Sequence, residues 1–248
     1  MKTILQTENL TKSFGQLMAV NRVDIEFREG ELTSIIGPNG AGKTTFFNLI
    51  SGKSRANAGK IRFRGDDITG LAPHQIVKKG IGRIFQITNL FPELSVYQNI
   101  RVSVLARMGE SSRLFSLDRK LRHVNEETSR ILELIGLSDR RDVTCSALSH
   151  GDQRLVETGV ALALEPRLLL LDEPTGGMGP EETDEMVKFV RRLSEKQRIT
   201  IILVEHDMRV VFSISDRIVV MHSGSVIADG KPDEIKEDER VKAAYLGS

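Results

Sequence analysis

Nine consecutive residues in the first fifth of the chain have the types and spacing that hold a phosphate group. Glycine lets backbone N–H groups close around a phosphate, a lysine offers its outer oxygens a positive charge, and a threonine offers Mg²⁺ a hydroxyl. The pattern predicts a nucleoside triphosphate with Mg²⁺ as the ligand; a glycine-rich turn with an exposed lysine is the alternative. The residues match the phosphate-loop motif of a glycine, four residues and Gly-Lys-Thr, and they are Gly37, Pro38, Asn39, Gly40, Ala41, Gly42, Lys43, Thr44 and Thr45.

The segments on either side place this loop between a strand and a helix. Leu32 to Ile36 is an apolar run of strand length, and Thr45 to Ile50 has helical character. Strand, loop and helix in this order are the context that the phosphate-loop motif requires. We therefore expect a helix N-terminus, with its unpaired N–H groups, to face the phosphates.

Two acidic residues follow a run of four leucines. Leu168 to Leu171 predicts a central strand buried on both faces, and Asp172 and Glu173 come directly after it. Because ligands of open α/β sheets bind at the carboxyl ends of strands, we expect both acids at the phosphates. Asp172 would hold Mg²⁺, and Glu173 would orient and deprotonate the attacking water. Acids that only solvate a strand end are the alternative.

Polar residues also end two other predicted strands. Residues 81–85 lead to Gln86, whose amide could coordinate Mg²⁺ or orient water. Residues 199–204 lead to His206, which could donate a hydrogen bond to the γ-phosphate. Taken singly, Gln86 could be a solvated loop residue and His206 a structural one.

Two further candidate sites lie elsewhere in the chain. Phe14 lies on the turn between two alternating segments, where its ring could stack on a purine base or belong to the core. Ser149 is a favourable N-cap for the helix that follows, and Gly151 leaves room for a ligand to approach that helix. An ordinary capped helix is the alternative to this second anion site.

Composition limits the classes of function. The 248 residues, 40% of them hydrophobic, can bury one large core. A net charge of +1, two tyrosines and no tryptophan argue against nucleic acid as a dominant partner. The one cysteine, Cys145, fits a reducing compartment. We expect neither a signal peptide nor a transmembrane segment, because the apolar runs are far shorter than the roughly 18 residues of a span.

Patterns along the chain predict strands before the phosphate loop and helices in the middle. Residues 4–14 and 20–27 alternate as antiparallel strands do. Ser95 could cap a helix that runs past Leu105, and a second helical pattern ends at Gly136. Beyond the acids, the chain predicts a helix from Pro180, a hairpin around Ser223 and Gly224, and a helical tail over residues 232–245.

The ordered set of motifs resembles the ATP-binding-cassette (ABC) ATPases over essentially the whole chain. This resemblance implies that Phe14 stacks on adenine and that Gln86 is the Q-loop residue. It implies that Ser149 and Gly151 belong to the signature motif. The remaining roles that it implies are the Walker B acid, the catalytic base and the switch histidine, for Asp172, Glu173 and His206 respectively.

The resemblance also implies a fold. It predicts an α/β P-loop NTPase core with a mixed, mostly parallel sheet, an antiparallel β subdomain and an inserted helical subdomain. Residues 1–248 would be a single ABC ATPase domain. Residues 1–88 and 165–248 would form the RecA-like core with the N-terminal antiparallel β subdomain, and residues 89–164 the helical subdomain with the signature motif.

The partners implied by the resemblance are proteins. In the family, the signature of one subunit closes over the nucleotide on the phosphate loop of another, which implies a head-to-tail dimer of identical or similar subunits hydrolysing ATP with Mg²⁺. Transmembrane permease subunits would be further partners, and a solute-binding protein an indirect one. Leu90 and Phe91 are candidate docking residues for the permease; the alternative is that they pack under the helical subdomain. The chain would lie peripherally at the cytoplasmic face of a bacterial inner membrane, without a nucleic-acid partner.

The signature and the tail resemble those of ATPase subunits of bacterial importers for branched-chain amino acids and related solutes. Residues 150–154, His-Gly-Asp-Gln-Arg, replace the commoner Gly-Gly-Gln signature, and the tail ends Ala-Tyr-Leu-Gly at residues 244–247. Lipopolysaccharide-export ATPases have a similar tail, so a lipid or lipopolysaccharide exporter remains an alternative, as does a soluble ABC ATPase without a membrane partner. A GTP-dependent switch is a weaker alternative, since the chain has no Asn-Lys-x-Asp motif.

Two positions depart from the family pattern. Asp152 brings a negative charge close to a bound phosphate, so we expect its carboxylate to point away from that phosphate. Gly179 stands where the family more often has Asp or Asn, which argues against coupling of two sites through a side chain at this loop.

Overall fold

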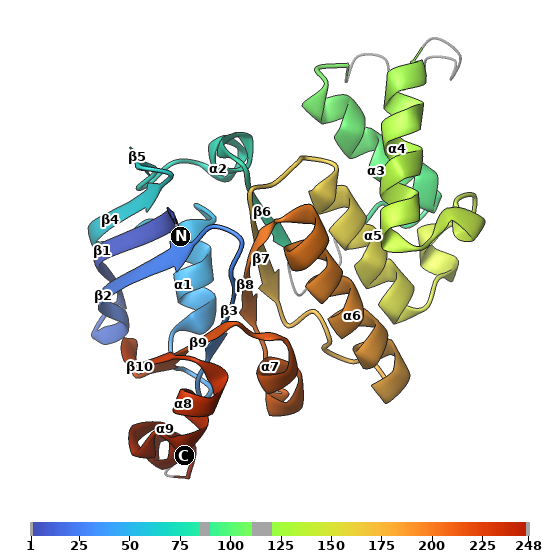
Figure 1. Ribbon diagram of the computed structural model, residues 1–248. Helices are drawn as coiled ribbons and strands as arrows, with labels where there is room; N and C mark the ends of the chain where they lie inside the picture. Colours follow the sequence, from blue (N-terminus) through green and yellow to red (C-terminus); the bar gives the residue numbers. More distant parts are fainter. Residues whose placement is uncertain (1, 85–89, 111–120, 247–248) are drawn as a thin grey trace. The chain divides into compact units, whose positions relative to one another are not determined.

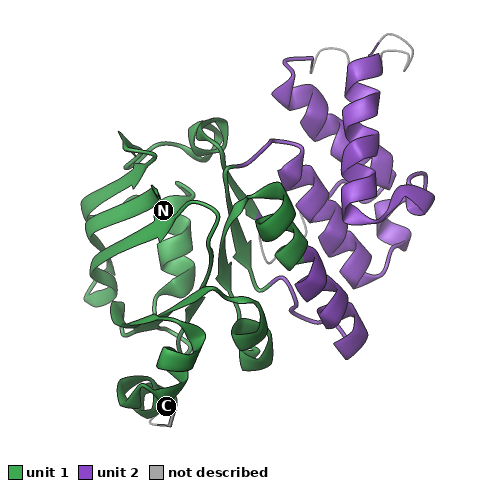
Figure 2. Cartoon of the chain, viewed as in Figure 1, with its two compact units in different colours: residues 1–83, 167–173, 190–248 green, residues 84–166, 174–189 purple. Residues whose placement is uncertain are grey.

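The computed structural model describes residues 2–84, 90–110 and 121–246, which form two compact units (Figure 2). The first unit contains residues 1–83, 167–173 and 190–248, and the second contains residues 84–166 and 174–189. Gln86 and Phe85 lie outside the described residues.

An antiparallel sheet begins the first unit, in the strand order β2-β1-β4-β5 (Figure 1). Along β2, buried and exposed residues alternate towards the end of the strand, because only one face of the sheet is covered. This confirms the predicted pair of strands before the phosphate loop. The strands are β1 (Thr3–Phe14), β2 (Leu17–Arg28), β4 (Ala58–Phe63) and β5 (Asp66–Asp67).

A six-stranded sheet, in the order β10-β9-β3-β8-β7-β6, forms the centre of the same unit. β3 pairs with β8 and β9 in parallel, β7 pairs with β8 in parallel, and β9 pairs with β10 antiparallel. The predicted mixed, mostly parallel sheet is confirmed. Its strands are β3 (Leu32–Ile36), β6 (Ile81–Ile84), β7 (Leu168–Asp172), β8 (Thr200–Val204), β9 (Arg217–His222) and β10 (Ser225–Gly230).

Burial explains the composition of the central strands. Every residue of β3, β7 and β8 is buried, which is why β7 and β8 contain unbroken apolar runs, at residues 168–171 and 201–204, rather than alternating residues. The carboxyl ends of all three point to one edge of the sheet, because the three strands are parallel. The phosphate loop, the two acids and His206 follow these ends directly.

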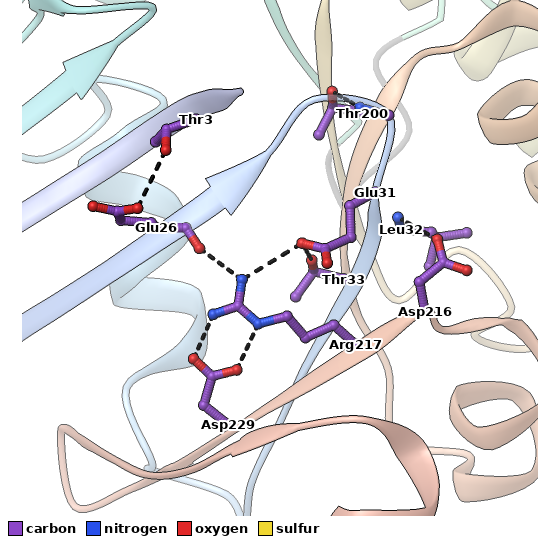
Figure 3. Close-up of polar contacts among 10 residues, drawn as sticks. Thr3, Glu26, Glu31, Leu32, Thr33, Thr200, Asp216, Arg217 and Asp229 are labelled. Atoms are coloured by element: carbon purple, nitrogen blue, oxygen red, sulfur yellow. Dashed lines mark hydrogen bonds and ion pairs between the residues drawn. The ribbon is translucent and has the colours of Figure 1, made fainter. Parts of the chain in front are cut away.

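Arg217, the first residue of β9, ties the two sheets of this unit together (Figure 3). Its guanidinium donates to both carboxylate oxygens of Asp229 on β10, and to the backbone oxygen of Glu26 on β2 at 2.7 Å. Glu31, just before β3, accepts a longer bond of 3.5 Å from the same group. One planar fork therefore fixes strands of both sheets at the end opposite to the phosphate loop.

The helices of the first unit flank the sheets. They are α1 (Lys43–Ile50), α2 (Pro73–Lys79), α7 (Met208–Ile214), α8 (Pro232–Glu237) and α9 (Glu239–Leu246), and α6 (Pro180–Gln197) begins in the second unit and ends in the first. The predicted helical tail is confirmed, and it consists of two helices, α8 and α9. Asp238 separates them, because its backbone is extended and its carboxylate accepts from the N–H of Arg240 in the first turn of α9.

The second unit is helical, with α3 (Val96–Arg107), α4 (Arg122–Ile135) and α5 (His150–Leu162). Ser95 caps α3 by accepting from the N–H of Gln98 at 3.2 Å, and Gly136 ends α4 with a left-handed φ of 76°. Both predicted helix boundaries are confirmed. Within the described part of the chain, no helix combines the length and the apolar composition needed to cross a membrane.

Candidate functional site

The loop between β3 and α1 needs glycine at specific positions. Gly37, Gly40 and Gly42 have φ angles of 151°, 80° and 102°, which lie in the region that favours glycine. A Cβ on Gly37 would lie 2.0 Å from the backbone oxygen of Met221, and one on Gly42 would lie 2.2 Å from that of Ala19. Neighbouring backbone therefore leaves no room for a side chain at residues 37 and 42.

We expect Gly42→Ala to destabilise the protein by about 1–3 kcal/mol more than Gly40→Ala does. Both substitutions carry the cost of a left-handed backbone, but only the methyl group at residue 42 collides with backbone, since nothing lies within 4 Å of a Cβ at residue 40. Urea unfolding of the two variants measures the difference. Equal midpoints would show that the backbone beside Ala19 can move away at little cost.

Lys43 turns back onto the loop. Its Nζ donates to the backbone oxygens of Gly37 at 2.6 Å and Pro38 at 3.1 Å, and the residue is 6% exposed. Burial lowers the pKa of Lys43, and the negative charges of Glu173 and Asp172 oppose that shift. The lysine and the two acids thus share one electrostatic environment. Of the other loop residues, Asn39, Gly40 and Thr44 are exposed, Pro38 and Thr45 are half-buried and Ala41 is buried.

The two acids have different surroundings. Asp172, the last residue of β7, is 4% exposed and accepts from Nη2 of Arg83 at 2.9 Å. Glu173 has a φ of 51°, a left-handed conformation that turns the chain out of the strand. Its Oε1 lies 2.8 Å from Nε2 of His206. An ionised carboxylate only accepts hydrogen bonds, so Nε2 is the donor in this pair.

These surroundings suit magnesium. Thr44 offers a hydroxyl and Asp172 a carboxylate, both of which are hard oxygen ligands. No group of three or more His, Cys, Asp or Glu side chains that could hold a metal occurs among residues 2–84, 90–110 and 121–246. Magnesium does not require one, since it commonly takes one or two protein ligands together with phosphate and water. Gln86, the third predicted ligand, lies outside the described residues.

Phe14 is not a core residue. It is the last residue of β1 and is 53% exposed, so the core interpretation of its ring was wrong, as was its placement on the turn itself. Nζ of Lys12 lies 5.0 Å from the centre of the ring, which shows that one face already attracts a cation. Adenine stacking stays a prediction.

The signature residues begin α5 in the second unit. Ser149 is its N-cap, with Oγ accepting from the N–H of Asp152 at 3.2 Å. Gly151 is buried, and a Cβ there would lie 2.9 Å from Oε1 of Glu182. The Asp152 carboxylate pairs with Arg140, which compensates its negative charge. This ion pair gives a physical reason to expect that the Asp152 carboxylate points away from a bound phosphate.

The sequence analysis did not single out two polar residues near the acids. Arg83 interrupts the apolar strand β6, and Glu205, only 3% exposed, accepts from the backbone N–H of His206 at 3.0 Å. A charged residue inside an otherwise apolar strand was the available indication for Arg83. For Glu205, its place between a buried strand and His206 was the indication.

The geometry defines the class of protein. A parallel strand leads through a glycine loop into a helix, and acids end a strand of the same sheet. The lysine of the loop lies in the electrostatic field of those acids. This is the arrangement of a P-loop nucleoside-triphosphate hydrolase.

Comparison with known proteins narrows the class to a family. Residues 20–176 match the family model described as ABC transporter, and residues 225–248 match the model described as branched-chain amino acid ATP-binding cassette transporter. The chain therefore belongs to the ABC transporter family, as an ATPase whose hydrolysis of ATP is coupled to transport. The resemblance drawn from the motifs is confirmed.

Individual relatives extend over nearly the whole chain. The high-affinity branched-chain amino acid transport ATP-binding protein BraF of Pseudomonas aeruginosa is 38% identical, with 99% of this chain and 98% of BraF covered. The corresponding protein LivG of Escherichia coli is 39% identical, with 98% of each chain covered. The lipopolysaccharide export ATP-binding protein LptB of Haemophilus influenzae is 33% identical, with 99% and 98% covered.

Solved structures agree with the fold. An ATP-binding cassette of an ABC transporter in its ADP conformation superposes with a TM-score of 0.86 at 33% identity, with both chains fully covered. A dimeric cassette in a post-hydrolysis state, bound to ADP and phosphate, gives a TM-score of 0.77 at 25% identity, with 92% of this chain and 99% of that chain covered.

Proposed function

We propose that this chain is the ATPase subunit that energises import of branched-chain amino acids or related small solutes. The observation that carries this proposal is the match of its tail, residues 225–248, to the branched-chain amino acid model. Relatives named for branched-chain amino acid transport, at 38% and 39% identity over nearly the whole chain, support the same solute class. The relative named for lipopolysaccharide export is less similar, at 33%.

The test is transport by the complete complex. The membrane proteins that co-purify with this chain would be reconstituted with it in liposomes, with ATP on the side of the ATPase. We expect ATP-dependent uptake of labelled leucine, isoleucine or valine once the matching solute-binding protein is added. Co-purification with lipopolysaccharide-extracting subunits, or with ribosomes, would contradict the proposal in favour of the alternatives.

The residues of the first unit support a mechanism of hydrolysis. Lys43 and the N–H groups of its loop would bind the outer phosphates, with Phe14 stacked on adenine. Thr44 and Asp172 would hold Mg²⁺, which when bound would neutralise charge on the phosphates, and Gln86 stays a further ligand predicted from the sequence.

Glu173 is placed to act as the general base. Water would attack the γ-phosphorus in line, its proton would pass to the Glu173 carboxylate, and the bond to the β-phosphate oxygen would break to release ADP. Nε2 of His206 donates to Oε1 of Glu173 in the structure. When ATP is bound, the same nitrogen would also donate a hydrogen bond to the γ-phosphate.

The proposed working unit is a head-to-tail pair of ATPase subunits, identical or similar. Each chain carries one phosphate loop and one signature, so two complete sites require two chains. The solved dimeric cassette with ADP and phosphate supports the pairing. In the pair, Ser149 and Gly151 of one copy would face the γ-phosphate held by Lys43 of the other, at the N-terminus of α5.

We expect Ser149→Ala to abolish most ATPase activity. The site that is lost is the one on the phosphate loop of the facing copy, because Ser149 would complete that site and not the site of its own chain. Mixing the Ser149→Ala chain with a Lys43→Ala chain should restore activity, because half of a random mixture of dimers then has one intact site. Steady-state ATPase assays of each variant and of the mixture measure this. A mixture no more active than its components would contradict action in trans.

Ser95→Ala is the matched control. Ser95 caps α3 with the same kind of bond, so its loss costs a comparable 0.5–2 kcal/mol or so of helix stability. We expect this control to retain its activity in the isolated ATPase.

A surface of the second unit suits the proposed permease. Phe91 is 55% exposed, whereas Leu90 is half-buried. The side chain of Asn99 accepts from the Phe91 N–H at 2.9 Å and donates to the backbone oxygens of Phe91 and Leu94, so the loop is held in place. An exposed ring on a fixed loop is suited to dock in a pocket of a membrane subunit at the cytoplasmic face of the membrane.

A further inference from the structure

One buried cation lies directly against the proposed magnesium site. The side chains of Arg83 and Asp172 are each 6% exposed, and Nη2 of the arginine donates to Oδ2 of the aspartate at 2.9 Å. Nη1 donates to Oδ1 of Asn48 at 2.7 Å and to Oγ of Ser51 at 2.8 Å. The guanidinium carbon also lies 5.6 Å from the centre of the Phe47 ring. Arg83 thus bridges β7 and the last turn of α1.

The anchors on α1 share the face of that helix that carries Thr44. Asn48 lies four residues after Thr44 and Ser51 seven, and residues at these spacings lie one above another on a helix. The fork of Arg83 therefore joins the two elements that supply the proposed magnesium ligands, α1 with Thr44 and β7 with Asp172. The length of the Arg83 guanidinium therefore sets the distance between α1 and the carboxylate of Asp172.

A role in stability alone explains this pair poorly. Both side chains are almost completely removed from water, and taking two charged groups out of water is unfavourable in itself. Buried ion pairs of this kind often contribute little more than apolar residues of the same volume. Placement of a carboxylate is a function that an apolar residue cannot perform.

We propose that Arg83 is a positioning residue for magnesium, which fixes the Asp172 carboxylate relative to the helix face that carries Thr44. This inference rests on the proposed function, in which Thr44 and Asp172 hold Mg²⁺. Partners that orient a metal ligand typically change metal affinity by about 10- to 100-fold when they are removed. A lysine ammonium carries its donors on one nitrogen and cannot reproduce the planar fork, so charge alone should not suffice.

The test measures metal binding without catalysis. Mn²⁺ replaces Mg²⁺ as the probe, and it is titrated into the protein–ADP complex while electron paramagnetic resonance follows free Mn²⁺. We expect the midpoint for Mn²⁺ to rise about tenfold or more in both Arg83→Gln and Arg83→Lys. The Kd of ADP in EDTA should stay within about twofold of the parent value, because the phosphate loop is unchanged.

Two controls sharpen the result. Arg62→Gln removes a half-buried arginine from a 2.8 Å pair with Glu8 in the same unit, and it should move neither value. Asn48→Ala leaves Arg83 and Asp172 in place but removes one anchor, and it should move the Mn²⁺ midpoint in the same direction by a smaller factor. If Arg83→Gln does not fold, Arg83→Lys and Asn48→Ala decide the question.

Two results would overturn the inference. One is an unchanged Mn²⁺ midpoint in the folded Arg83 and Asn48 variants. The other is an equal weakening of ADP binding with and without the metal, because that would show a general support of the loop. Asp172→Asn in the parent background separates this inference from the proposed function: if that variant binds Mn²⁺ as the parent does, the metal site itself is wrong.

Discussion

The Glu173→Gln variant should hydrolyse ATP about 10²- to 10⁴-fold more slowly than the parent while it binds ATP with unchanged affinity. Glutamine keeps the size of the side chain and an oxygen that can accept from His206, but it cannot take a proton from water. The contacts of Lys43 and Asp172 do not change. Since bound ATP joins the two copies and is no longer removed, the variant should accumulate as an ATP-bound dimer.

Two measurements on one sample check this expectation. Single-turnover hydrolysis gives the rate, and light scattering during size-exclusion chromatography with Mg-ATP gives the mass. Glu8→Gln, at an exposed carboxylate of the same unit, should behave like the parent. Rapid hydrolysis by Glu173→Gln would show that Glu173 is not the general base. Monomers at saturating Mg-ATP would contradict a pair that is joined by ATP.

Lys43→Ala should weaken ATP binding by about 10- to 100-fold, since hydrogen bonds to a charged group contribute about 1.5–3 kcal/mol each. The effect should appear in the Kd itself, because in the proposed site the lysine would contact the phosphates before any reaction. Calorimetric titration with ATP measures it.

The same substitution also removes the bonds of Nζ to the backbone of Gly37 and Pro38, so loop stability needs its own measurement. Lys60→Ala, at an exposed lysine of β4, is the control for a lost surface charge. A Kd equal to that of the parent would mean that the loop is not the principal phosphate site. If Lys43→Ala loses ATP binding only because the protein unfolds, Lys43 stabilises the loop and does not bind the ligand.

Local rules predicted the elements that local chemistry determines. Ser95 and Ser149 end up as N-caps because a serine hydroxyl satisfies the first N–H groups of a helix wherever that helix packs. Gly136 ends α4 because few residues other than glycine adopt its left-handed φ. The four leucines of β7 predicted a central strand buried on both faces, whereas the mostly parallel sheet was implied by the family resemblance.

Contacts between residues that are far apart in the sequence could not be predicted by these local rules. Nothing near Arg83 in the chain shows that it meets Asn48 and Asp172, because these residues are 35 and 89 positions away. The break at Asp238 was missed since the charged residues around it suit a helix as well as a turn. The helix α7 was not predicted because it has only seven residues. It directly follows His206 and Asp207, and these two residues were interpreted as the polar end of a strand rather than as the start of a helix.

The most direct test of the account is a structure of Glu173→Gln with Mg-ATP under conditions in which the parent turns over. We predict two copies in which Oγ of Ser149 from one lies within hydrogen-bond distance of the γ-phosphate bound at Lys43 of the other. If Ser149 of every neighbouring copy lies far from every γ-phosphate, ATP is not shared between two subunits and the proposed mechanism is wrong.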